Sequence, residues 1–275
     1  MKIQQGFNQV RVWSYVGLAS LLFLATWQWT VQVDRSLGIS AFNSGWVLFA
    51  VLAFLTLFSV RKRLPFMPLL PASLWFILHT IGGFLALFLF LLHTDSMGTK
   101  GFYGQVLTVL FYITSISGVI GLFIEKVYPR QLTCSGGEII YERIPAEIAG
   151  IREEVESLIL KCTEENGTST LAEHYLETLS WYFHKPRFFL NNIFVSHLSQ
   201  HWVRQQCMIL ERFLSEKERV YLDKVYMLAE KKRKIDFHYA LQTLLKTWLL
   251  VHIPMAGAVM AMVLWHLILI LVFFV

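Results

Sequence analysis

Two segments decide the fold: PASLWFILHTIGGFLALFLFLLHT at residues 71–94 and WLLVHIPMAGAVMAMVLWHLILILVFFV at residues 248–275. Neither contains an aspartate, glutamate, lysine or arginine. A helix of about 20 apolar residues is long enough to cross the hydrocarbon core of a bilayer. Both segments are therefore predicted to be transmembrane helices.

The whole chain is more apolar than an ordinary soluble domain. Hydrophobic residues make up 55% of its 275 residues, charged residues 16%, and the mean hydropathy is +0.52. Such a composition is typical of integral membrane proteins, so we expect lipid contact and an all-α, polytopic bundle of about five transmembrane helices. Uncharged runs of suitable length lie near residues 12–32, 44–60, 71–93, 104–124 and 247–275.

Charged residues are concentrated in one long insert between the fourth and fifth runs. We expect three regions: four transmembrane helices at 1–124, an insert at 125–246, and a fifth transmembrane helix at 247–275. The insert holds 17 of the 24 basic residues and 17 of the 19 acidic ones, so it is neutral in sum. The net charge of +5 therefore arises beside the membrane spans, and no nucleic-acid partner is expected.

The insert has helical periodicity. Residues 142–162 place Ile144, Ile148 and Val155 on one apolar stripe, and residues 168–183 form a second amphipathic segment. Residues 188–246 contain neither proline nor glycine, and we expect one rod that runs on into the fifth span. The basic run 231–234 in this rod suits either anionic lipid headgroups or a solvated helix face.

Lysine and arginine positions give an orientation. Arg61, Lys62 and Arg63 follow the second span without a compensating acid. Loops rich in lysine and arginine stay in the cytoplasm. This places the N-terminus and the 125–246 insert in the cytoplasm and the C-terminus outside.

Four of the nine histidines lie inside the two opening segments, with the same spacing in each: His79 and His93, His252 and His266. Fourteen residues of helix make almost four full turns and rise roughly 21 Å, so each pair shares one face at two depths. If the helices run parallel, His79 meets His252 and His93 meets His266. Each meeting pair could bind the iron of one haem b from both sides, which predicts two haems. The alternative is that these histidines are polar contacts between helices.

Small residues near the histidines would leave room for a flat porphyrin ring. We interpret the small residues Gly82, Gly83, Gly257 and Gly118 as room for a porphyrin, although small residues are also common in helix packing. A coordinating imidazole gives its second N–H to an acceptor. We expect this acceptor to be a carbonyl one turn earlier or a hydroxyl such as Thr80 or Thr94.

Other cofactor chemistries are not indicated. Cys134, Cys162 and Cys207 show no Cys-x-x-Cys spacing, and no phosphate-loop or dinucleotide fingerprint is present. His197 and His201 are four residues apart, as in helical zinc sites, but a surface or packing role is favoured. We therefore assign no catalytic residue.

The histidine pairs resemble those of the ferric reductase and NADPH oxidase transmembrane domain, and more loosely the diheme cytochromes b of respiratory complexes. Residues 45–64 and 75–94 look like the bacterial branch of that group, and SGVIGLFIEKVYPRQL at 117–132 looks like a segment of bacterial cytochrome b-like proteins. The resemblance covers about half of the chain. It implies His79, His93, His252 and His266 as axial ligands and the inner membrane of a bacterium as the location.

The sequence departs from that group in two ways. No flavin and nicotinamide domain follows the fifth span, and a helical insert separates spans four and five. We therefore expect an electron-transfer subunit rather than a self-contained enzyme. Its partners would be a quinone, a cytochrome c, or an iron–sulfur or flavin protein. The alternatives are a direct ferric or cupric reductase and a non-redox scaffold subunit.

Overall fold

The computed structural model describes residues 2–36, 40–61, 71–95, 97, 99, 101–134, 139–194 and 198–273, with the backbone alone for 2–11, 40, 59–61 and 127–134. Throughout these ranges the regular structure is helical and there is no strand, which confirms the all-α prediction. The chain forms two compact units. A membrane unit comprises 1–123 and 248–275, and an insert unit comprises 124–247, so their junctions lie one residue from the expected divisions.

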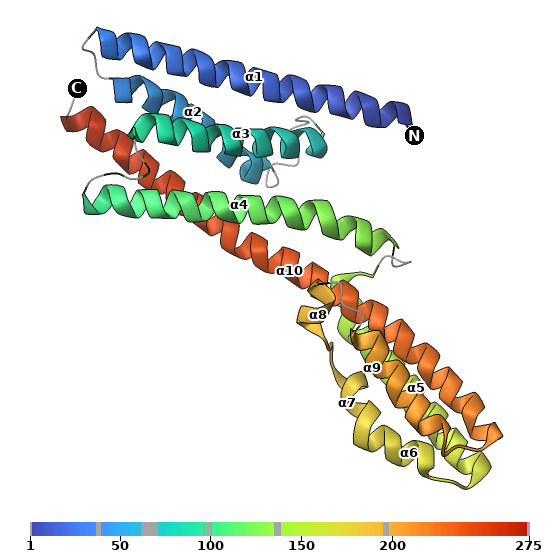
Figure 1. Ribbon diagram of the computed structural model, residues 1–275. Coiled ribbons are helices and arrows are strands. Elements are labelled where there is room, and N and C mark those ends of the chain that lie inside the picture. Colours follow the sequence, from blue (N-terminus) through green and yellow to red (C-terminus); the bar gives the residue numbers. More distant parts are fainter. Residues whose placement is uncertain are drawn as a thin grey trace. The chain divides into compact units, whose positions relative to one another are not determined.

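The helices of the membrane unit are α1 (Lys2–Arg35), α2 (Ser40–Arg61), α3 (Ala72–Thr94), α4 (Phe102–Cys134) and the end of α10 (Glu216–Phe273) (Figure 1). The insert unit contains a 3-10 turn η1 (Tyr141–Arg143), α5 (Ile144–Asn166), α6 (Thr170–His174), a π-helical turn η2 (Tyr175–Leu179), α7 (Ser180–His184), α8 (Phe189–Ile193), α9 (Leu198–Glu211) and the beginning of α10.

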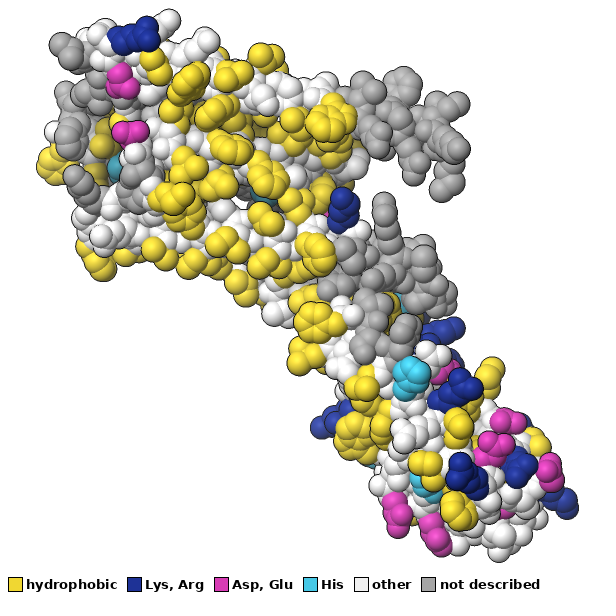
Figure 2. All heavy atoms as spheres, viewed as in Figure 1, with side chains coloured by type: hydrophobic (Ala, Val, Ile, Leu, Met, Phe, Trp, Pro, Cys, Tyr) yellow, Lys and Arg dark blue, Asp and Glu magenta, His cyan; other side chains and the backbone are white. Residues whose placement is uncertain are grey.

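Within the described ranges, five helices are long and apolar enough to cross a membrane. The protein is therefore a multi-pass membrane protein, as predicted. Large apolar side chains such as Phe88 (53% exposed) and Ile116 (60% exposed) point outward from these helices. In Figure 2 hydrophobic side chains cover the visible face of the membrane unit, and charged side chains lie only at its ends. Outward apolar side chains are what lipid contact requires.

Within the membrane unit α1, α2 and α3 pack closely against one another. A buried apolar cluster connects them with α4 and α10: Leu48, Leu85, Ala86, Leu89, Phe90, Phe111 and Val259. Phe90 and Phe111 stack at its centre with ring centroids 4.3 Å apart. This cluster lies between the two histidine levels of α3 and fixes the register of that helix against its neighbours.

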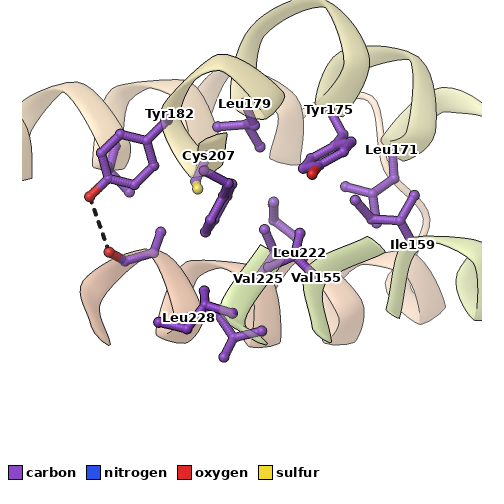
Figure 3. Close-up of a cluster of buried hydrophobic side chains, with 14 of the residues drawn as sticks. Val155, Ile159, Leu171, Tyr175, Leu179, Tyr182, Cys207, Leu222, Val225 and Leu228 are labelled. Atoms are coloured by element: carbon purple, nitrogen blue, oxygen red, sulfur yellow. Dashed lines mark hydrogen bonds between the residues drawn. The ribbon is translucent and has the colours of Figure 1, made fainter. Parts of the chain in front are cut away.

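The insert unit has an ordinary water-soluble core. The predicted stripe of α5 is buried, including Ile144, Ile148 and Val155, and it faces the aromatic side chains of η2 and α7 (Figure 3). Tyr182 is fully buried, and its hydroxyl donates a hydrogen bond to the carbonyl of Ala229 (3.2 Å), shown dashed in Figure 3.

The predicted rod over 188–246 is wrong in part. The segment contains α8, α9 and the start of α10, with a break between Glu211 and Glu216, and only α10 continues into the fifth span. Ser215 and Glu218 explain the break between Glu211 and Glu216. The Ser215 N–H and hydroxyl both donate to the Glu218 carboxylate, at 2.9 and 2.8 Å, which is a helix-starting capping arrangement.

The basic run 231–234 is neither uniformly solvated nor uniformly turned to lipid. Lys231 and Lys234 are exposed, whereas the side chain of Lys232 is fully buried. Its ammonium donates to the Asp236 carboxylate at 2.6 Å and to the Lys185 carbonyl at 3.0 Å, and it lies over the Tyr182 ring.

The residues that gave the orientation are outside this description. Lys62 and Arg63 are not among the described residues, and only the backbone of Arg61 is described. The cytoplasmic position of the insert remains a prediction from the sequence.

Candidate functional site

The four candidate histidines lie on α3 and α10. Helix α3 begins after Pro71 and ends at Asp95, which has a left-handed backbone (φ 49°), so His93 occupies its last turn. Helix α10 passes through Pro254 without ending. A proline inside a helix leaves the carbonyl four residues earlier without its usual donor. In α10 this freed carbonyl belongs to Leu250, two residues before His252.

The structure brings the histidines together in the expected pairs. The rings of His93 and His266 face each other with centroids 6.4 Å apart and planes at 82°. His79 is close enough to His252 for the two rings to interact electrostatically. Each pair takes one ring from α3 and one from α10. In this pairing the two helices run parallel, which is the condition on which the expected pairing depended.

Helix α2 holds His93 in place. The Nδ1 atom of His93 is 2.9 Å from the carbonyl oxygen of Ala41 and 3.3 Å from the Ser44 hydroxyl. A carbonyl oxygen can only accept, so Nδ1 carries the proton and Nε2 has a free lone pair. Gly45 leaves room for this ring, because a Cβ there would be 2.9 Å from His93 Cε1.

His266 is held by an aromatic neighbour. The Tyr103 ring of α4 stacks on it, with centroids 6.4 Å apart and planes at 14°. The Tyr103 hydroxyl donates to the carbonyl of Met262, one turn before His266 on α10. Tyr103 therefore bridges α4 to α10 and limits rotation of the His266 ring.

Helix α4 also holds His252. The Nδ1 atom of His252 is 3.2 Å from the Ser117 hydroxyl, and the Trp248 indole stacks on its ring at 5.2 Å. The same indole donates to the Ser117 carbonyl at 2.9 Å. It packs directly on the backbone at Gly121, where a Cβ would overlap the indole. Ser117, Gly121 and Trp248 together fix one face of His252.

His79 packs against helix α2. Its ring packs on Phe58 of α2 with centroids 4.9 Å apart. Among the described residues its buried Nδ1 atom has no hydrogen bond of ordinary geometry, although the Leu55 carbonyl interacts with the ring. A buried ring nitrogen usually has a partner. An incompletely bonded imidazole at this depth is chemically suited to bind an added group.

The spacing of His93 and His266 is compatible with two axial ligands of one haem iron. An imidazole nitrogen binds a transition metal at about 2 Å, so two imidazoles on opposite sides of one iron have ring centres roughly 6 Å apart. The 6.4 Å between His93 and His266 agrees with that spacing. A Cβ at Gly83 would meet nothing within 4 Å, so the α3 surface between the two levels has open space. Gly82 is different, since Leu55 packs against it.

Other potential ligands of the chain do not form a second centre. Across the described ranges no group of three or more histidine, cysteine, aspartate or glutamate side chains could hold a metal ion. A haem iron uses two protein ligands, so this finding bears on zinc or iron clusters only. His201 is exposed on α9, and His197 lies outside the described residues. Cys162 and Cys207 are buried free thiols, and the side chain of Cys134 is not described.

The expected acceptors for the histidine N–H groups were wrong for His93. Thr94 donates its hydroxyl to the Phe90 carbonyl (2.9 Å), and the partner of His93 is Ala41 on another helix. No local pattern identifies Ala41, because any residue supplies a carbonyl. Ser117 carried a weak signal, as a hydroxyl among small residues in an apolar span.

Comparisons with protein-family models, with curated proteins and with solved structures found no match for this chain.

Proposed function

We propose that this protein is a membrane cytochrome b that transfers electrons across the bilayer through two haems b. The observation that carries the proposal is the His93–His266 pair. Its rings lie 6.4 Å apart, and the Ala41 carbonyl holds the proton of His93 on Nδ1, which leaves Nε2 free to act as a ligand. The second pair, His79 and His252, lies fourteen residues earlier on both helices, and its rings are close enough to interact electrostatically.

The residues have distinct roles in this proposal. His79 and His252 would hold one haem, and His93 and His266 the other. Ala41, Ser117 and Tyr103 orient the rings. A haem with two histidine ligands has no open position on its iron and exchanges single electrons. Apolar helices around the pairs exclude water and would favour electron transfer over reaction with solvent.

The two levels make the arrangement a conduit. Fourteen residues of helix rise roughly 21 Å, which is most of the thickness of the hydrocarbon core. An electron entering at the level of His79 and His252 would leave near His93 and His266. Since His93 occupies the last turn of α3, the second level lies near one membrane surface.

The ends of the conduit belong to other molecules. We infer a location in the inner membrane of a bacterium, with the N-terminus and the insert in the cytoplasm and the C-terminus outside. A quinone or a cytoplasmic donor would supply electrons on the His79 side. An iron–sulfur protein, a flavoprotein or a cytochrome c would complete the chain of transfer as a partner subunit.

The first experiment is a haem count on the purified protein. The pyridine haemochrome assay should give two haems b per chain, and dithionite should produce the sharp α-band of a six-coordinate b haem. His252→Leu should reduce the count to one. His201→Leu, on the exposed face of α9, is the matched control and should leave two. A wild-type count of zero, with normal folding by circular dichroism, would refute the proposal and favour a scaffold subunit.

A second candidate is direct reduction of ferric or cupric complexes. We call His93 and His266 the outer pair and His79 and His252 the inner pair. Direct reduction is favoured by the position of the outer pair, because His93 is two residues from the exposed Asp95 at the end of α3. A haem edge there could meet a soluble metal chelate without a partner protein. Mixing the dithionite-reduced, desalted protein with ferric citrate distinguishes the two. Rapid reoxidation supports the reductase, and slow reoxidation supports the conduit.

A further inference from the structure

The insert unit exposes an apolar face at α8. Phe189, Leu190 and Phe194 are 37%, 64% and 79% exposed, and they lie within one and a half helical turns. Figure 2 shows hydrophobic side chains gathered at α8. Met208, Ile209 and Phe213 at the end of α9 are exposed as well (53%, 45% and 72%), but the charged residues Glu211 and Arg212 lie among them in the sequence. Three large exposed apolar residues on one short helix need a covering.

The outward direction of this face is fixed by the residues beneath it. Asn192 is buried and donates its side-chain N–H to the Arg187 carbonyl at 3.2 Å. Phe188 packs on the rings of Tyr182 and Trp202, at 6.4 and 6.0 Å. Leu190 and Phe194 are four residues apart and therefore share one side of α8. The helix cannot turn that side inward without breaking these contacts.

The surroundings of α8 carry positive charge. No aspartate or glutamate occurs between Glu177 and Glu211, whereas Lys185 and Arg187 lie immediately before α8. The Arg187 guanidinium lies 4.2 Å over the half-exposed Trp181 ring. The rest of the insert unit is rich in acidic residues, so this segment differs in charge as well as in hydrophobicity. Basic and aromatic residues beside an apolar helix face are typical of the membrane interface.

The chain also connects α8 to a helix that enters the membrane. Phe189 contacts Tyr239 of α10, with ring centroids 6.4 Å apart. Tyr239 precedes Trp248, where the membrane unit begins, by nine residues of the same helix. Helix α8 therefore packs on the part of α10 that leads along the chain into its membrane span.

We propose that α8 is a lipid-binding surface that inserts Phe189, Leu190 and Phe194 into the interfacial layer of an anionic membrane. Lys185 and Arg187 contact lipid phosphates, and the apolar face enters the boundary between headgroups and acyl chains. The insert unit would thereby be held to the bilayer surface by a third attachment besides α4 and α10. This inference is independent of haem binding.

The test measures the depth of a spin label in the full-length protein. Leu190→Cys is labelled in nanodiscs that contain phosphatidylglycerol, and collision rates are measured with oxygen, which partitions into lipid, and with a water-soluble nickel chelate. The matched control is Leu176→Cys, an equally apolar and 71% exposed position of the same unit. The ratio of oxygen to nickel collisions should be several-fold higher at position 190 than at position 176.

A charge variant separates lipid binding from other coverings. Lys185→Gln should increase nickel access at position 190 in phosphatidylglycerol nanodiscs and change it little in phosphatidylcholine nanodiscs. Equal ratios at positions 190 and 176 would overturn the proposal. So would low access of both reagents with spin–spin broadening that grows with protein concentration, because a second copy of the chain would then cover α8.

Discussion

The membrane unit and the insert unit bury their polar groups in opposite ways. In the insert unit Lys232 and Asp236 are fully buried and bond to each other at 2.6 Å. In the membrane unit the four histidines are paired across two helices, yet among the described residues no hydrogen bond joins one of these histidines to another. The insert pair balances its charges internally, although the Asp236 Oδ1 atom has no hydrogen bond among the described residues. The histidine pairs keep ring nitrogens available for an added group.

The two units also differ in where their apolar side chains lie. Apolar side chains of α5 and α7 point into the core of the insert unit, while those of the membrane unit largely point outward (Figure 2). The surrounding solvent explains the difference, because water expels apolar surface and lipid does not. A polar side chain inside the membrane unit is therefore expensive and needs a function, whereas an internal ion pair in the insert unit needs only its partner.

The strongest test of this comparison is the removal of one outer histidine. His266→Leu should lower the haem count from two to one and leave the inner pair intact, because the two levels use different residues. The thermal unfolding of the insert unit should not change. Pyridine haemochrome counts and thermal scans with a thiol-reactive dye measure both effects, since Cys162 and Cys207 are buried in the insert core. Loss of both haems would mean that the levels are not independent.

The insert ion pair should respond strongly to loss of one partner. Asp236→Leu leaves a buried ammonium without its counter-charge, and we expect a loss of about 3–5 kcal/mol in the free energy of unfolding. Lys232→Met with Asp236→Leu should recover most of it, since two apolar groups need no partner. Dye-monitored denaturant titrations give both values. Lys234→Met, at an exposed position, is the control. If Asp236→Leu is as stable as wild type, the buried Lys232 ammonium does not depend on Asp236 as its counter-charge.

Substitution of Gly121 in α4 tests how His252 is held. Gly121→Ala places a methyl group where the Trp248 indole lies, so the indole must shift away from His252. We expect a loss of about 1–3 kcal/mol and a changed spectrum of the inner haem. Gly17→Ala is the control, because a Cβ there meets nothing within 4 Å. Reduced-minus-oxidised spectra with thermal scans provide the measurement. An unchanged spectrum of the inner haem would show that Trp248 does not position His252.

The smallest expected effect is at the start of α10. Ser215→Ala removes a capping hydroxyl and should cost about 1 kcal/mol in the free energy of unfolding of the insert unit alone.

Hydrogen bonds from Thr168 and then Ser215 hold the pKa of Glu218 below its ordinary value of 4.5. A carboxylate with a lowered pKa contributes stability that is fully present above pH 4.5 and is lost as the pH falls through the folded pKa. The difference between wild type and Glu218→Gln should therefore shrink in acid, in denaturant titrations at pH 3 to 7.

Much of the fold could be predicted from local sequence. Apolar runs gave the five spans, and the spacing of Ile144, Ile148 and Val155 gave the buried stripe of α5, because both signals depend only on helix geometry and solvent. The break before α10 also has a local signal, the capping pattern Ser215-x-x-Glu218, but the lack of proline and glycine over 188–246 favours one continuous rod.

The surroundings of the candidate site could be predicted only in part. Equal spacing on two apolar helices brings His79 toward His252 and His93 toward His266 once the helices are parallel. The sequence could not show that Ala41 would bond His93 or that Trp248 would cover His252. These contacts join residues far apart in the chain, and their chemical groups occur at many other positions.

The sequence by itself determined that this is a helical membrane protein with four histidines at two depths, because hydrophobicity and helical period act over neighbouring residues. Only the tertiary structure decided which side chains fix those rings and which lysine of the 231–234 run is buried. These contacts depend on how segments far apart in the chain pack together. The approach of Gly45 to His93 and the bond from Lys232 to the Lys185 carbonyl are two examples.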